Sequence, residues 1–233
     1  MSILVLIQSG FFGLSGTVSM YIVGAVLTVI LAYLIGSLNF SRLFAKRLDC
    51  KTDVFELNNK AGTKGVVIPL LLDFFKGILC ATWGLFAMPG SGFVILAGIF
   101  CILGHNFPVF YKFKSNGNAG GFSTFAGMML VINPLMAVIS IIAGLILFFV
   151  TRYPTSFVLL SSVIFPILSD RFPLWKFTAE NVEEKANFVY SINVVLSWAF
   201  PFVLMLLVLV FYGISIGRMV RGKEEKLVFG NKK

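Results

Sequence analysis

The single histidine of the chain, His105, is the residue best suited by type to acid–base chemistry. It follows Gly104 in the segment GHNFPVFYKFK at residues 104–114. A neutral imidazole can accept a proton from a hydroxyl group near pH 7, or it can donate a hydrogen bond to a phosphate. One histidine cannot form a metal cluster, so we expect no metal site here. The alternative is that His105 only orders its loop.

Two glycine-bearing segments, each placed before an apolar run, could bind phosphate. Backbone N–H groups in glycine-rich turns and at helix starts attract anions, and nearby lysines add positive charge. One segment is SNGNAGG at residues 115–121, and the other is NNKAGTKG at residues 58–65. Such turns also begin many helices without binding a ligand, and the second segment could be a solvated loop. The phosphate-binding candidates are Asn59, Lys60, Lys64, Lys114, Asn116, Gly117, Asn118, Gly120 and Gly121.

Asp73 and Lys76 lie within the apolar run that begins near Gly65. Their spacing places them on one helical face, and lone charges in lipid are costly, so we predict that they pair. The pair could be a structural ion pair facing a helix bundle, or it could contact a ligand directly. Both glycine-bearing segments should lie at the same membrane interface as this pair. Together these features predict a site for a ligand with an anionic head and a lipid tail.

The elements that must hold these residues are membrane helices. The chain has 233 residues, of which 58% are hydrophobic and 12% charged. Its mean hydropathy of +0.94 is far above that of soluble globular proteins. We expect an all-α, seven-helix integral membrane domain at residues 18–217, with an interfacial extension at 1–17 and a basic tail at 218–233. Because about 20 apolar residues span a bilayer, the seven candidate segments are 18–38, 65–88, 93–111, 120–133, 134–151, 154–169 and 192–217.

The basic residues lie in short stretches between the apolar runs, which indicates topology signals rather than nucleic-acid binding. If the first helix runs from outside to inside, only Arg171, Lys176 and Lys185 fall outside, and Lys76 lies within a helix. All other lysines and arginines are then cytoplasmic. We therefore predict an external N-terminus, a cytoplasmic C-terminus and a multi-pass location in the cell membrane. The three cysteines lack metal-binding spacing, so we expect neither a disulfide nor a zinc site.

The order and spacing of these motifs resemble the bacterial acyl-phosphate-dependent glycerol-3-phosphate acyltransferases of the PlsY type. The segment AYLIGS at residues 32–37 resembles the family's GSxPxG motif. The segment LDFFKG at residues 72–77 resembles its LDxxKG helix, and residues 104–114 resemble its GHxxPxFxxFKGGKG loop. The resemblance covers roughly residues 18–169, and the last of these motifs is the most specific.

The resemblance implies a seven-helix inner-membrane fold and acyl transfer from acyl phosphate to glycerol 3-phosphate, without a cofactor. The implied partners are these two substrates or a related anionic lipid, together with the bilayer and not nucleic acid. Acyl phosphate is already activated, so the site need only hold two phosphates and direct a hydroxyl at the carbonyl. The residues implied are His105 and Ser37 as catalytic groups, with Gly36, Asp73 and Lys76 contacting substrate.

The sequence departs from the family pattern in four places. The first motif has Asn39 for proline and Ser41 for glycine, and residues 58–63 are the only possible remnant of the family's GSGNxGATN motif. The third loop lacks its lysine, and residues 211–215 lack the family's Arg-His-Arg-Glu-Asn stretch. Loss of charge-assisted phosphate contacts costs a few kcal/mol, or several powers of ten in rate.

Three functions therefore stay open. The first is a divergent acyltransferase of phospholipid synthesis, and the second is a noncatalytic relative that binds lipid or a membrane-protein partner. The third is a small transporter or channel, because buried charges also line transport pathways. The sequence has no visible inverted repeat, which disfavours the third.

Overall fold

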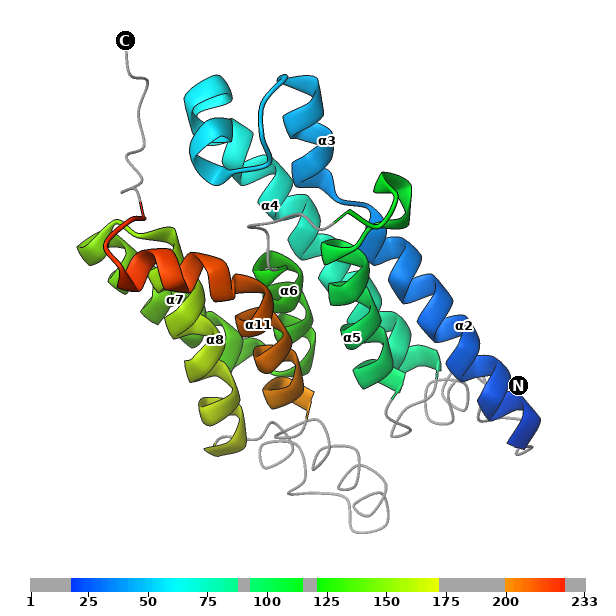
Figure 1. Ribbon diagram of the computed structural model, residues 1–233. Helices are drawn as coiled ribbons and strands as arrows, with labels where there is room; N and C mark the ends of the chain where they lie inside the picture. Colours follow the sequence, from blue (N-terminus) through cyan, green and yellow to red (C-terminus); the bar gives the residue numbers. More distant parts are fainter. Residues whose placement is uncertain (1–17, 88–92, 115–120, 172–199, 225–233) are drawn as a thin grey trace.

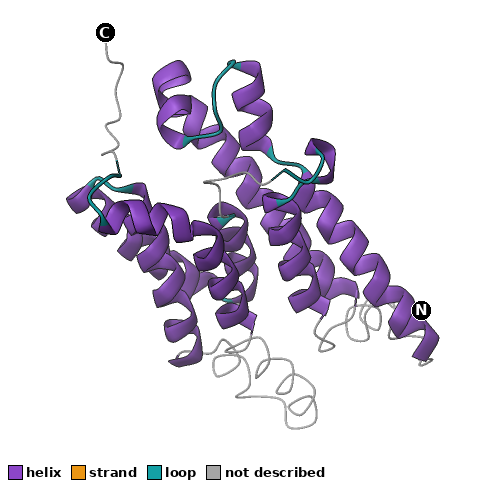
Figure 2. Ribbon diagram, viewed as in Figure 1, coloured by secondary structure: helices purple, strands orange, loops and turns teal. Residues whose placement is uncertain are grey.

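The computed structural model describes residues 18–87, 93–114, 121–171 and 200–224, and the regular structure within these ranges is helical (Figures 1 and 2). The elements are α2 (Val18–Ser37), α3 (Phe40–Arg47), α4 (Val54–Ala87), α5 (Phe93–Asn106), the 3-10 helix η2 (Val109–Tyr111), α6 (Phe122–Ile132), α7 (Pro134–Thr151), α8 (Pro154–Arg171) and α11 (Phe200–Val220).

The predicted all-helical membrane architecture is confirmed, because each of the seven candidate segments contains a helix. By length and composition, five helical stretches in the described residues can cross a membrane, and they contain α2, α4, α5, α7 and α11. The helices α6 and α8 are shorter apolar elements. The proposed extension at residues 1–17 lies outside the described residues.

The stretch labelled α4 is two helices that meet at a kink: the second follows Gly62 and agrees with the membrane helix predicted to start near Gly65, whereas the helical turns from Val54 were not predicted. The chain bends at Gly62, whose φ of 61° and ψ of −160° favour a residue without a side chain. Before the bend, Leu57 is buried against Ala45 of α3, an element that hydropathy alone did not predict. The polar residues that follow Leu57 made this stretch resemble a solvated loop.

The third candidate span covers Phe93–Tyr111, as predicted. Within it the α-helix α5 stops at Asn106, and η2 forms the last turn. Pro108 lies just after this end and adopts an extended conformation before the short 3-10 helix. Proline lacks an N–H group and disfavours helical geometry in the residue before it. His105 is therefore held in the last turn of α5 rather than in its interior.

Glycines let two pairs of helices approach closely, as small residues do in membrane bundles. A Cβ atom added at Gly36 would overlap the backbone of Cys101, and one added at Gly104 would overlap the carbonyl of Tyr33, so α2 and α5 pack backbone to backbone. A Cβ atom added at Gly77 of α4 would likewise overlap the backbone of Thr124 in α6. These approaches bring the end of α2, the middle of α4 and the end of α5 together.

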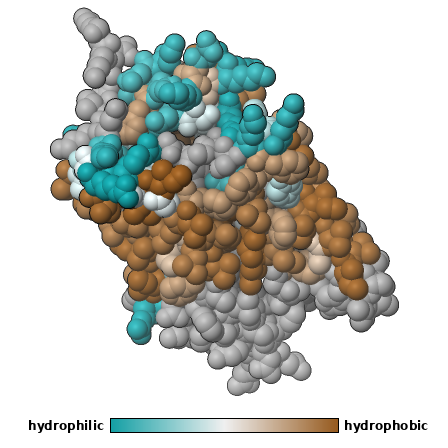
Figure 3. Space-filling model, viewed as in Figure 1, coloured by the Kyte–Doolittle hydropathy of each residue, from teal (hydrophilic) through white to brown (hydrophobic). Residues whose placement is uncertain are grey.

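The outer surface matches a bilayer environment. Many large apolar side chains point outward, including Val150 and Val210, which are 77% and 72% exposed. Figure 3 shows a broad hydrophobic band over the bundle, with hydrophilic residues gathered at the end that carries α3 and the start of α4. The band is the surface that lipid would cover.

Candidate active site

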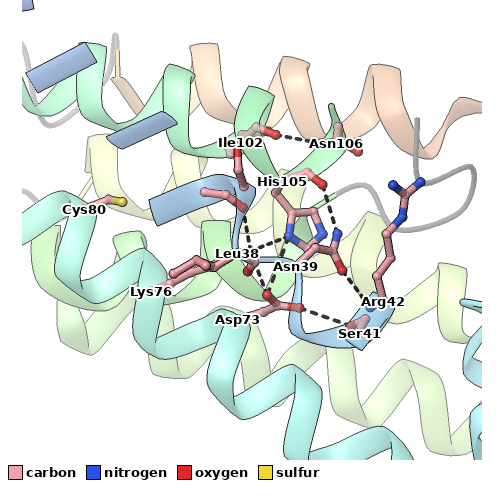
Figure 4. Close-up of polar contacts among 12 residues, drawn as sticks. Leu38, Asn39, Ser41, Arg42, Asp73, Lys76, Cys80, Ile102, His105 and Asn106 are labelled. Atoms are coloured by element: carbon pink, nitrogen blue, oxygen red, sulfur yellow. Dashed lines mark hydrogen bonds and ion pairs between the residues drawn. The ribbon is translucent and has the colours of Figure 1, made fainter. Parts of the chain in front are cut away.

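Lys76 is the centre of a buried polar cluster where α2, α4 and α5 meet (Figure 4). Its Nζ atom lies 2.7 Å from Oδ1 of Asp73, and the two side chains are only 3% and 1% exposed. The same atom donates hydrogen bonds to the carbonyl oxygens of Gly36 at 3.1 Å and Leu38 at 3.0 Å. It also lies 2.7 Å from Nδ1 of His105. The predicted contact between Asp73 and Lys76 is therefore present, and Lys76 also contacts His105.

Asn39, which caps α3, and Ser41, in its first turn, connect this cluster to α3. Asn39 accepts a hydrogen bond from the backbone of Arg42 at 2.9 Å, which caps the start of α3, and donates one to the carbonyl oxygen of His105 at 3.0 Å. Ser41 donates a hydrogen bond from Oγ to Oδ2 of Asp73 at 3.1 Å. Asn39 and Ser41 thus hold the backbone of the histidine and the carboxylate of Asp73 (Figure 4).

Ser37, which the resemblance implies is catalytic, is fully buried and bonded to the backbone. Its hydroxyl donates to the carbonyl oxygen of Tyr33 at 2.8 Å and accepts from the N–H group of Val109 at 3.4 Å. Ser37 is not among the described residues that line the cavity beside His105. In this structure its hydroxyl positions the segment after His105, and its catalytic role stays a prediction.

A cavity of about 230 Å³ lies beside the polar cluster. Ser41, Asp73 and His105 form a polar part of its lining, and Gly121, at the start of α6, lies next to them. Most of the remaining wall is apolar and comes from α4, α6, α7 and α8. This combination suits a ligand with a reactive polar head and a hydrocarbon chain. The apolar wall includes Val66, Leu70, Phe122, Leu145, Phe148, Phe157 and Val158.

A second, more polar cavity of about 360 Å³ adjoins the first. The two cavities share four lining residues, Asp53, Val54, Pro154 and Tyr212. The second cavity lies between the start of α4, the start of α8 and the end of α11. Its basic side chains come from α11 and the residues after it. The polar groups that line it include Asn59, Thr155, Ser215, Arg218, Lys223 and Glu224.

The phosphate-binding candidates separate into three groups. Asn59 lines the polar cavity and Gly121 lines the apolar one. Lys60, Lys64 and Lys114 are exposed and line neither cavity. The remaining candidates, Asn116, Gly117, Asn118 and Gly120, lie outside the described residues.

Sequence reasoning missed Thr155, Arg218 and Lys223 as groups lining a cavity. The two basic residues were interpreted as topology signals, since they follow the last apolar run. Thr155 follows Pro154 at the start of α8 and is only 2% exposed. A buried polar residue in the first turn of an apolar helix is the signal that could have identified it.

Comparison with known proteins agrees with this architecture. A family described as glycerol-3-phosphate acyltransferase matches residues 26–222. The glycerol-3-phosphate acyltransferase of Paraburkholderia phymatum is 30% identical over 226 residues, which cover 89% of this chain and 93% of that protein. A Thermoanaerobacter relative with the same description is 29% identical, with 87% of this chain and 96% of the relative covered.

Two crystal structures of PlsY, an integral membrane glycerol 3-phosphate acyltransferase, share the fold. The lysophosphatidic acid form has a TM-score of 0.67 and 24% identity, and the match covers 88% of this chain and 95% of PlsY. The glycerol 3-phosphate form has a TM-score of 0.68 and 23% identity, with 88% and 96% covered. The chain therefore belongs to the PlsY-type glycerol-3-phosphate acyltransferase family of multi-pass membrane proteins.

Proposed function

We propose that this protein transfers an acyl group from acyl phosphate to glycerol 3-phosphate, producing lysophosphatidic acid and inorganic phosphate. A hydroxyl oxygen of the acceptor forms a bond to the carbonyl carbon, and the bond between that carbon and the phosphate oxygen breaks. The departing phosphate takes up the hydroxyl proton. The observation that carries the proposal is the mainly apolar cavity whose polar lining includes His105, Asp73 and Ser41.

The two adjoining cavities suit the two substrates. The apolar walls formed by α4, α7 and α8 accommodate the hydrocarbon chain of the donor, and its acyl phosphate lies near His105 and Gly121. The start of α6 adds the positive end of a helix dipole at that point. In the polar cavity Arg218 and Lys223 lie among the carboxylates of Asp53, Glu56 and Glu224, and these two basic groups can bind the phosphate of a water-soluble acceptor directly. Both substrates then meet where the cavities join.

We further propose that the N-terminus is external and that the site opens to the cytoplasm. The distribution of basic residues along the sequence supports this orientation. The positive-inside rule assigns three separate segments to the cytoplasm, and all three contribute to the lining of the polar cavity. Their residues there include Asp53, Pro154 and Arg218. Figure 3 places many hydrophilic residues at the same end of the bundle.

The direct test is purified protein in lipid nanodiscs with radiolabelled glycerol 3-phosphate and palmitoyl phosphate. We expect labelled lysophosphatidic acid, with His105→Ala reducing the rate by about 100-fold or more. Val210→Ala, at an outward-facing position, is the matched control and should keep full activity. No product from the wild-type protein, combined with salt-sensitive binding of lysophosphatidic acid, would instead support a noncatalytic relative.

A further inference from the structure

The three protons of the Lys76 ammonium group account for its three hydrogen-bond partners. These partners are the carbonyl oxygens of Gly36 and Leu38 and the Nδ1 atom of His105, at 3.1, 3.0 and 2.7 Å. Asp73 Oδ1, also at 2.7 Å, supplies an opposite charge. That oxygen makes no directed hydrogen bond within the part of the chain that the structure describes. The geometry of Lys76 is thus that of a charged ammonium paired with a carboxylate.

A charged Lys76 determines which nitrogen of His105 carries the proton. If Nδ1 were protonated, two N–H donors would face each other at 2.7 Å in a site that water barely reaches. A neutral Lys76 would relieve that conflict, but it would leave the buried carboxylate of Asp73 without its cation. The arrangement that satisfies all three side chains has Nδ1 accepting from Lys76 and a proton on Nε2.

The opposite edge of the imidazole ring lies beside Gly121, which precedes α6. The ring carbon Cδ2, which is bonded to Nε2, lies 3.5 Å from the position that a Cβ atom would occupy at Gly121. Gly121 and His105 both line the apolar cavity. Asn39 holds the carbonyl oxygen of His105, so the backbone that carries the ring is also fixed (Figure 4). The edge that holds Nε2 therefore lies on the side of the ring next to Gly121, where the proposed function puts the acyl phosphate.

We propose that Lys76 fixes His105 as the tautomer with its proton on Nε2, so that His105 donates a hydrogen bond to an oxygen of the acyl phosphate and does not remove the acceptor's proton. The substrate assignment rests on the proposed function. An Nε2 atom that already carries a proton cannot accept another, whereas it can stabilise negative charge that develops on a carbonyl or phosphate oxygen. Lys76 is then a positioning residue that acts through His105.

The tautomer can be measured directly because the chain contains one histidine. Protein labelled with ¹⁵N-histidine, held in nanodiscs without substrate, gives one pair of ring-nitrogen signals. We expect Nδ1 to give the signal of an unprotonated nitrogen at pH 7 and Nε2 that of a protonated one. A proton on Nδ1 in the wild-type protein would overturn the proposal. Since the measurement needs no turnover, it is independent of whether acyl transfer occurs.

Variants at Lys76 test its role in positioning. Lys76→Met removes the donor to Nδ1, so we expect the ¹⁵N signals to become those of mixed tautomers. We expect the kcat for acyl transfer to fall at least about 10-fold with little change in the KM for glycerol 3-phosphate. Lys46→Met, at an exposed position on α3, is the matched control and should leave both readouts unchanged. Unchanged ¹⁵N signals in a folded Lys76→Met variant would contradict a positioning role.

Variants at His105 separate hydrogen-bond donation from proton removal. The side-chain amide of His105→Gln can donate a hydrogen bond near the position of Nε2 but cannot act as a base at pH 7. We therefore expect His105→Gln to be at least about 10-fold more active than His105→Ala. Equal loss in both variants, in protein that folds normally, would argue that His105 must accept a proton.

Discussion

Oε1 of Glu224 accepts two hydrogen bonds from Thr155, one from its hydroxyl at 2.6 Å and one from its backbone N–H group at 3.1 Å. This contact joins the segment after α11 to the first turn of α8, although the two residues are 69 positions apart. A carboxylate at a helix N-terminus satisfies an otherwise unpaired N–H group and interacts favourably with the helix dipole. The contact closes one side of the polar cavity.

Because of this contact, we expect Thr155→Val and Glu224→Ala each to lower stability by about 1 kcal/mol. The double variant should lose less than the sum of the two, because the variants remove the same hydrogen bond. Thermal unfolding of all four proteins in one detergent gives the coupling energy. Additive effects would show that the two residues do not interact in the membrane protein.

Asp73→Ala should destabilise the protein by about 3 kcal/mol, because it leaves the ammonium group of Lys76 buried without its carboxylate. Asp73→Ala combined with Lys76→Ala should be milder than the sum of the single changes, since no lone charge remains. The measurement is a thermal-shift cycle in detergent. A double variant that is as unstable as the sum predicts would exclude a coupled pair.

Gly104→Ala should lower stability by about 2 kcal/mol, because the added methyl group would meet the backbone of α2 and push α5 away from it. Gly213→Ala in α11 is the matched control, since among the described residues no atom outside its own helix lies within 4 Å of the added Cβ. This control should be neutral or slightly stabilising. The two variants are compared by thermal unfolding, and equal stability would contradict the close helix contact.

The proposed orientation can be tested at Cys50, which lies between α3 and α4 and is half-buried, whereas Cys80 and Cys101 are fully buried. A membrane-impermeant maleimide should label Cys50 in inside-out vesicles and not in right-side-out spheroplasts. Cys50→Ser is the control and should remove the signal. Labelling of the spheroplasts would place this end of the bundle outside.

The same experiment has an expected pH dependence. Burial raises the pKa of the Cys50 thiol, and the nearby carboxylate of Glu56 raises it further. A raised pKa means less thiolate at pH 7, and the thiolate is the reacting species. We therefore expect labelling to become faster as pH rises from 7 to 9, to a greater degree than for free cysteine.

The apolar runs of the sequence were sufficient to predict the membrane helices. Their length and composition reflect the requirement that backbone groups be satisfied inside lipid, which is a local property. The pairing of Asp73 with Lys76 could also be predicted, because the two residues share one helix face. The bend at Gly62 could not, since many glycines are compatible with a straight helix and packing on α3 selects the bent form.

Sequence patterns could not predict the contacts between distant segments. Asn39 and Ser41 were recorded as departures from a motif, and only the three-dimensional structure shows that they bond to His105 and Asp73. Side-chain hydrogen bonds depend on which helices come together, and hydropathy does not specify that. A polar replacement inside a motif can supply a new partner as well as remove an old one.

If the apolar cavity binds the donor, as we propose, the reaction takes place at the boundary between two phases. A donor that is dissolved in the bilayer is measured by its mole fraction among lipids, whereas glycerol 3-phosphate is measured by its concentration in water. For a site with an apolar wall and a polar end, the rate should depend on the mole fraction of the donor among the lipids and on the aqueous concentration of glycerol 3-phosphate. Diluting the donor with inert lipid would then slow turnover even when its amount per volume stays constant.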